Sequence, residues 1–157
     1  MQNFSTKIVL FDANMPKIDE IDKKILDILM SNSRTPFTDI ALRLNVSEGT
    51  VRKRVKRLED QGVIREYTID IDPSKLGYRS VTLLGLDTEP EHYLDAINSL
   101  DALEQVRWVA KSTGDHMIMA EIWTEDDEEL GRLIDENICT INGVKRICPA
   151  IILKKMR

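Results

Sequence analysis

The sequence is poor in cysteine and has no long apolar run, and both absences narrow the class of protein. Its 157 residues include only two cysteines, Cys139 and Cys148, nine positions apart, which is not a zinc-binding spacing. The first residues lack a small-residue cleavage site, so no secretory signal is predicted, and we expect both thiols to be reduced and packed in the core. No apolar run approaches the ~18 residues that cross a bilayer, which predicts a cytoplasmic protein with no membrane partner.

Positive charge is in the minority, yet it is concentrated in one short segment. The chain has 22 Lys and Arg against 27 Asp and Glu, a formal net charge of -5. Residues 1–62 nevertheless carry a net charge of +2 and residues 63–157 a net charge of -7, which suggests two modules with different partners. The sequence RKRVKR at residues 52–57 holds five cations and no acid.

Residues 17–64 have the pattern of three short amphipathic helices. Asp19 is a suitable N-cap for the first, and apolar residues then recur at helical spacing. We expect Thr35 to cap a second helix and Ser47 to cap a third, with Asn45 ending the second in a left-handed conformation. Two helices joined by so tight a turn, with a first helix to complete the core, indicate a helix-turn-helix domain.

The third predicted helix places its basic residues on one outward face. If Val51, Val55 and Leu58 face the core, the cations fall opposite or beside that position at about 100° per residue. A DNA major groove accepts such a helix, with its first residues near base edges and later cations near phosphates. The bland alternative is a solvated basic face. The residues expected at double-stranded DNA are Thr35, Ser47, Glu48, Gly49, Thr50, Arg52, Lys53, Arg54, Lys56 and Arg57, with Lys53 also reaching a base.

Residues 80–157 contain strand-like and helix-like segments in the order of a ferredoxin-like βαββαβ domain. Thr88 and Thr124 are expected to cap its two helices, and Leu94 to line the buried face of the first. Residues 65–79 are predicted as a hinge strand and linker, because apolar and polar residues alternate from position 67 onward. The predicted fold class is therefore α+β: an N-terminal (winged) helix-turn-helix domain plus the C-terminal ferredoxin-like domain.

The face of this sheet away from its helices is expected to carry apolar side chains. Simple alternation along one strand places Val106, Trp108 and Ala110 on the same face, and Met119 is expected on the open face too. A contiguous apolar patch is unusual on a monomer, and two-fold pairing with a second copy covers it. We therefore expect a homodimer.

Three stretches resemble the Lrp/AsnC, or feast/famine, transcription regulators. They read LNVSEGTVRKRVKRLEDQGVIREYTIDIDPSKLG, STGDHMIMAEIW and INGVKR, and the similarity runs from about Lys17 to the C-terminus. Residues 1–16 form an N-terminal extension that the resemblance does not explain. The resemblance implies a DNA-binding domain, a hinge strand, and an effector-sensing domain that assembles into dimers and higher oligomers such as octamers.

The resemblance also implies an amino acid as effector and no cofactor. The effector would bind at residues that match the family's hairpin and a following loop, here Thr113, Gly114, Asp115, His116, Thr140, Ile141 and Asn142. From the residues themselves, Gly114 lets the backbone approach a ligand carboxylate and Asp115 could accept hydrogen bonds from an α-amino group. An ordinary hairpin turn explains the same residues.

An enzyme on the same scaffold is the alternative function, because some haem-biosynthetic decarboxylases resemble these regulators. Such chemistry requires acid-base groups, yet His92 and His116 are the only histidines and no Cys-His or paired-carboxylate motif is present. We therefore expect no catalytic activity and no bound metal. The identity of the amino acid, the target genes and the direction of regulation are not encoded in any pattern of these residues.

Overall fold

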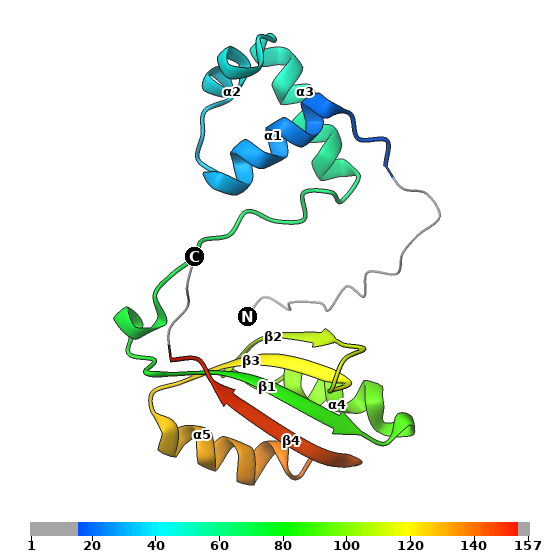
Figure 1. Ribbon diagram of the computed structural model, residues 1–157, viewed down its shortest axis with the longest axis vertical. Helices are drawn as coiled ribbons and strands as arrows, with labels where there is room; N and C mark the ends of the chain where they lie inside the picture. Colours follow the sequence, from blue (N-terminus) through cyan, green and yellow to red (C-terminus); the bar gives the residue numbers. More distant parts are fainter. Residues whose placement is uncertain (1–15, 154–157) are drawn as a thin grey trace. The chain divides into compact units, whose positions relative to one another are not determined.

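The computed structural model describes residues 16–153, which divide into two compact units (Figure 1). The first unit ends at Asp70 and the second begins at Ile71, inside the segment predicted as the hinge and linker. The predicted N-terminal extension lies outside the described residues, apart from Pro16. Within residues 16–153, no helix is both long enough and apolar enough to cross a membrane.

The first unit consists of three helices whose ends follow from local sequence. They are α1 (Glu20–Ser31), α2 (Phe37–Leu44) and α3 (Glu48–Asp60). The Asp19 carboxylate accepts the Asp22 N–H and the Asp22 carboxylate accepts the Asp19 N–H, which forms a capping box at the start of α1. Asn45 adopts the left-handed conformation, with φ of 53°, and ends α2 as predicted.

A small apolar core holds these helices together. Ile25 and Leu29 of α1 pack with Ile40 of α2 and with Val51 and Val55 of α3. All five side chains are buried, and so is Leu58, which confirms the inner face predicted for α3.

Two predictions in this region are wrong. Thr35 does not cap α2, because its hydroxyl donates to the Asn32 carbonyl and α2 begins after Pro36 with no side-chain cap. No strand forms over residues 63–72, where the chain runs without a neighbouring strand until the short helical turn η1 (Pro73–Leu76). Alternation of residue types favours an extended chain, but a strand also requires a second strand to pair with, and none lies beside residues 63–72 within the described part of the chain.

The second unit is a four-stranded antiparallel sheet in the order β2-β3-β1-β4. Its strands are β1 (Ser80–Thr88), β2 (Val106–Lys111), β3 (Ile118–Thr124) and β4 (Val144–Ile151). A turn, η2 (Pro90–His92), precedes α4 (Tyr93–Asp101), while α5 (Asp127–Leu133) continues into a π-helical turn (Ile134–Ile138). The order of elements confirms the predicted ferredoxin-like fold.

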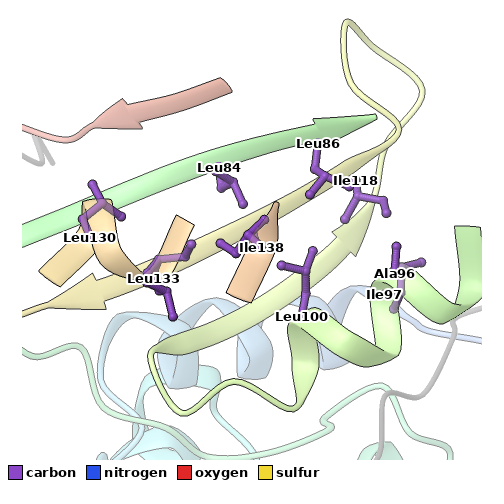
Figure 2. Close-up of a cluster of buried hydrophobic side chains, with 11 residues drawn as sticks. Leu84, Leu86, Ala96, Ile97, Leu100, Ile118, Leu130, Leu133 and Ile138 are labelled. Atoms are coloured by element: carbon purple, nitrogen blue, oxygen red, sulfur yellow. The ribbon is translucent and has the colours of Figure 1, made fainter. Parts of the chain in front are cut away.

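One face of the sheet packs against both helices and forms the main core (Figure 2). In the antiparallel register Leu84 lies opposite Ala120 and Leu86 opposite Ile118, so these side chains share one face. The core consists of strand residues and of residues from α4, α5 and the π-helical turn: Leu84, Leu86, Ala96, Ile97, Leu100, Ile118, Ala120, Ile122, Leu130, Leu133 and Ile138.

Several local predictions in the second unit are corrected by the sheet. Thr88 and Thr124 are buried terminal residues of β1 and β3 rather than helix caps, and Asp126 caps α5 instead. The reason is that strand pairing continues past the apolar residues of each strand: Thr88 pairs with Val144, and Thr124 pairs with Ser80. Leu94 was expected in the core but is 56% exposed, and Cys139 is exposed rather than packed in the core.

A bulge in β2 alters which side chains share a face. The register shifts between Val106 and Trp108, so that Val106 and Val109 both pack toward the core. Trp108 is paired with Glu121 and is partly exposed. The predicted open-face position of Trp108 is confirmed. The prediction that Val106 shares this face is wrong, because period-two counting fails across a bulge.

Leu84→Ala is expected to lower the free energy of unfolding of the second unit by about 2–5 kcal/mol, because it leaves a cavity in a fully buried site. Leu94→Ala removes the same atoms from an exposed position and is expected to change stability by less than about 0.5 kcal/mol. Urea denaturation followed by tryptophan fluorescence measures both, since the chain's two tryptophans, Trp108 and Trp123, lie in β2 and β3. Equal effects would contradict this assignment of the core.

Candidate functional site

The N-terminal end of α3 presents small polar groups to the outside. The Ser47 hydroxyl oxygen accepts the Thr50 N–H at 3.1 Å, which caps the helix as predicted, and lies 2.8 Å from the Thr50 hydroxyl. Gly49 is exposed, and a Cβ there would have only the Ser47 hydroxyl within 4 Å, at 3.9 Å. The first turn of α3 therefore offers two hydroxyls and, at Gly49, a backbone with no side chain, which a ligand can approach closely.

Three cations of α3 lie on its exposed side with weak or no acid partners. Arg52 pairs with Glu48 at 2.6 Å and Lys56 pairs with Asp60 at 3.2 Å, both one helical turn away and both exposed. Such pairs contribute little and exchange readily for other partners. Lys53 is exposed and forms no ion pair with any residue in 16–153. These side chains are available to an anion.

The other two cations of α3 are held by an acid that the sequence analysis did not consider. Arg54 Nη1 donates to Asp22 Oδ1 at 2.8 Å and to Asp19 Oδ2 at 2.7 Å, while Arg57 Nη2 donates to Asp22 Oδ2. Asp22 lies 32 positions before Arg54 and its side chain is fully buried. One sequence signal existed: Asp22 stands three positions before the buried Ile25, on the inward side of α1.

The Asp19 carboxylate of this cluster is stabilised in its charged form. A hydrogen bond from the Asp22 N–H, together with one from the Arg54 guanidinium, lowers the pKa of Asp19 to about 2. Hydrogen bonds to Asp19 and Asp22 in turn raise the pKa of Arg54. The basic run on α3 is therefore divided into an exposed group, residues 52, 53 and 56, and a group paired with α1, residues 54 and 57.

The hairpin predicted to bind the effector joins β2 to β3. Thr113, Gly114 and Asp115 are exposed at its tip, whereas His116 turns inward. The His116 ring lies directly over the backbone of Gly85: an ideal Cβ on that glycine would be 2.2 Å from the ring. Glycine at position 85 is thus required by this close approach rather than by an unusual backbone angle.

Asp87 and Arg146 tie the hairpin to the rest of the sheet, and sequence reasoning missed both. One Asp87 oxygen accepts the Met117 N–H at 2.9 Å, and the other lies 3.2 Å from His116 Nδ1. Arg146 Nε donates to Asp87 at 2.8 Å, while its Nη2 donates to the Asp115 carbonyl at 2.7 Å. Asp87 is the charged residue that ends the apolar stretch SVTLLGL, which was the available signal.

The Asp87 carboxylate is stabilised in its charged form. Partial burial opposes ionisation, but the Met117 N–H, the His116 side chain and the Arg146 guanidinium outweigh it and lower the pKa of Asp87. At neutral pH the hairpin therefore contacts a carboxylate anion through the Met117 N–H and the His116 ring.

The second predicted effector loop lies at the same end of the sheet. The strands that follow the two loops, β3 and β4, begin beside the end of β1, where Leu86 is opposite Ile118 and Thr88 is opposite Val144. Within the loop, the Thr140 hydroxyl donates to the Asn137 carbonyl at 2.8 Å, and Ile141 packs against the core. Thr140 and Asn142 are both exposed, and the Asn142 amide nitrogen lies 3.4 Å from His92 Nδ1.

A group of possible metal ligands is found beside this loop. Oxygens of Glu89 and Glu91 and a nitrogen of His92 all lie within 4.8 Å of one another. Glu89 is also paired with Lys145 at 3.5 Å, and His92 contacts Asn142. These contacts account for the arrangement of the group without an ion.

Comparison with known proteins adds to this geometry. Residues 18–65 match a winged helix-turn-helix DNA-binding family, and residues 79–156 match the C-terminal dimeric alpha+beta barrel domain of AsnC-type regulators. The HTH-type transcriptional regulator LrpA of Pyrococcus horikoshii is 53% identical over 140 residues, covering 89% of this chain and 99% of its own. LrpA1 of Halobacterium salinarum is 34% identical over 139 residues, covering 88% and 98%.

Solved structures show the same fold. E. coli AsnC has a TM-score of 0.79 at 28% identity, with 90% of this chain and 97% of that chain covered. A transcriptional regulator from Neisseria meningitidis, solved in complex with L-methionine, has a TM-score of 0.81 at 20% identity and covers 90% and 93%.

A helix-turn-helix unit with an exposed basic helix, followed by a ferredoxin-like domain, defines a DNA-binding transcription regulator. The degree of identity to LrpA makes the assignment specific. The chain belongs to the Lrp/AsnC family of transcription regulators.

Gly85→Ala is expected to displace the His116 ring and to lower the free energy of unfolding of the second unit by about 1–3 kcal/mol. Gly131→Ala, at an exposed position in α5 where a Cβ has no neighbour within 4 Å, is the matched control. We expect it to stabilise the unit by up to about 1 kcal/mol, because alanine favours a helix. Urea denaturation of both variants tests this, and an equally stable Gly85→Ala would show that the ring does not occupy this position.

Proposed function

We propose that this regulator reads DNA with the exposed side of α3 and that an amino acid bound at the hairpin end of the sheet alters its assembly or its DNA affinity. The observation that carries the first part is the inward register of α3, which buries Val51, Val55 and Leu58 and leaves Lys53 exposed and unpaired among the described residues. The second part is supported by the two loops that meet at one end of the sheet.

The DNA-facing residues are assigned by their place on α3. Ser47, Glu48, Gly49 and Thr50 enter the groove at the helix N-terminus, where backbone N–H groups also favour an anion. Lys53, one turn further along, reaches a base edge. Arg52 and Lys56 contact phosphates after releasing their exposed acids. We leave out Thr35, because its side chain is buried and its hydroxyl is already bonded to Asn32.

The effector is an amino acid held at the hairpin. The Gly114 N–H, which donates to the Ser112 hydroxyl at 3.3 Å in this structure, exchanges that partner for the α-carboxylate of the ligand. The exposed Asp115 carboxylate accepts from the α-amino group, with Thr140 and Asn142 alongside. The N. meningitidis relative binds L-methionine, which supports an amino acid as the chemical class. The hairpin itself is held in place by contacts among His116, Asp87 and Arg146, and these side chains do not contact the ligand directly.

The active species is a homodimer that assembles further, for example into octamers. The open face of the sheet carries Trp108 and Trp123, whose indole N–H groups both donate to the Glu121 carboxylate, at 2.9 and 2.6 Å. Trp108 remains 41% exposed, and a second copy covers it. With a two-fold axis, two copies of α3 meet half-sites about one DNA turn apart, so the operator is roughly palindromic.

Catalysis forms no part of this proposal, and the site of action is cytoplasmic DNA. The relatives at 53% and 34% identity are named transcriptional regulators. The decarboxylase alternative has little support from the residues, because both histidines are engaged in contacts within the domain, with Asp87 and with Asn142. Purified protein that carries a visible chromophore or decarboxylates a porphyrin would reverse this preference.

Lys53→Ala is expected to weaken operator binding by roughly 1–3 kcal/mol, because it removes the contact to one base. Binding to a random duplex is expected to change far less. Equilibrium titration with DNA from upstream of the gene, and with a random duplex, measures the difference. Lys24→Ala, which removes an equal charge from an exposed position on α1, is the control. If both variants bind the operator like the wild type, α3 is not the reading helix.

Adding a mixture of the twenty amino acids is expected to shift the operator titration or the sedimentation profile of the wild-type protein. Asp115→Asn is expected to lower the affinity for the effector amino acid by about tenfold or more, because it removes a charged hydrogen-bond acceptor. Glu104→Gln is the matched control, since Glu104 precedes β2 at the opposite end of the sheet from the hairpin. An unchanged response in Asp115→Asn would remove this residue from the effector site.

A further inference from the structure

Asp22 is a buried charge inside the helix-turn-helix unit, and it touches the basic helix rather than the solvent. Its side chain has no exposed surface, and its two oxygens are divided between two arginines of α3. Oδ1 accepts from Arg54, while Oδ2 accepts from Arg57 and from the Asp19 N–H. A buried carboxylate that loses its cations is strongly destabilised, so Asp22 does not release these arginines as an exposed acid would.

Arg54 and Arg57 are paired with an acid on another helix, unlike the other cations of α3. The Arg54 side chain is 23% exposed and also donates to Asp19. The Arg52 side chain is 66% exposed, and its acid partner is an exposed glutamate on its own helix, while its guanidinium lies 5.4 Å from the centre of the Phe37 ring. The Arg57 side chain is 42% exposed, but its Nη2 donates to Asp22 and its Nε is buried. Two acids at the start of α1 and two arginines of α3 thus form a nearly neutral cluster between the two helices.

We propose that Asp22 is a positioning residue that limits binding to DNA of arbitrary sequence. By holding Arg54 and Arg57 against α1, it withholds two of the five cations of α3 from the phosphate backbone. This inference rests on the proposed role of α3 as the reading helix. Phosphate contacts strengthen binding to every sequence alike, whereas base contacts discriminate. Withholding cations therefore increases the ratio of specific to non-specific affinity.

The inference predicts a gain of binding where a purely structural role predicts a loss. In Asp22→Asn the amide retains a hydrogen-bond acceptor but no charge, so at least one arginine is free to reach a phosphate. We expect the slope of log affinity against log salt for a random duplex to become steeper by about one to two. At 100 mM salt, affinity for that duplex is expected to rise about fivefold. The affinity ratio of operator to random duplex is expected to fall.

The experiment uses the full chain and fluorescence anisotropy with a labelled random duplex and a labelled operator, between about 50 and 200 mM salt. Asp27→Asn is the matched control, because it makes the same charge change on α1 at an exposed residue. We expect it to leave the slope within about 0.3 of the wild type, since it releases no cation of α3. Circular dichroism establishes that each variant is folded.

A second variant keeps the test decisive if Asp22→Asn does not fold. For the random duplex, Arg57→Gln is expected to change the slope of log affinity against log salt by well under one. The double variant with Lys53→Gln and Lys56→Gln is expected to make that slope shallower by about one or more. A folded Asp22→Asn variant with an unchanged or shallower slope would overturn the inference. So would an Arg57→Gln variant whose slope becomes shallower by about one, which is the loss of one phosphate contact. If Lys53→Gln and Lys56→Gln leave both the slope and the operator affinity unchanged, the assignment of α3 itself fails.

Discussion

The packing of α3 against the other two helices is the contact on which the DNA-binding surface depends. Val51 and Val55 pack with Ile25 and Ile40, and this register determines which side chains of α3 can leave the domain. A helix rotated by one residue would bury cations and expose valines. The same register brings Arg54 and Arg57 over α1, where Asp22 receives them. Apolar burial and ion pairing therefore act on the same helix and separate its cations into two groups.

The sheet domain has an analogous constraint at the end of its central strand. β1 has β3 on one side and β4 on the other, so the segments that lead into both strands meet where β1 ends. Asp87 joins these parts through the Met117 N–H and the Arg146 guanidinium. The apolar core between the sheet and its two helices holds the strands in register. A site at this end is consequently built from loops, but its geometry is maintained by strands.

Much of the fold could be predicted, because periodicity and caps are local properties. Ser47, Asn45 and the apolar stripes of the three helices have the roles that the sequence indicates. Predictions failed where a distant segment decides the outcome. Strand pairing incorporated Thr88 and Thr124, which resemble helix caps in isolation, and a bulge broke the expected alternation near Trp108. The alternating segment after α3 lacks a neighbouring strand within the described residues and so forms none.

The sequence by itself determined the two-part architecture, the helix-turn-helix and the basic run, because each depends on residues within about one or two helical turns. It also carried the resemblance to the Lrp/AsnC family. Only the tertiary structure decided which cations of that run remain available, since Asp22 and Arg54 are 32 positions apart and meet through packing of α1 on α3. The same holds for Asp87 and Arg146, which are 59 positions apart and adjacent only through the register of β1 with β4. Charge pairing acts through space, and a linear pattern does not contain it.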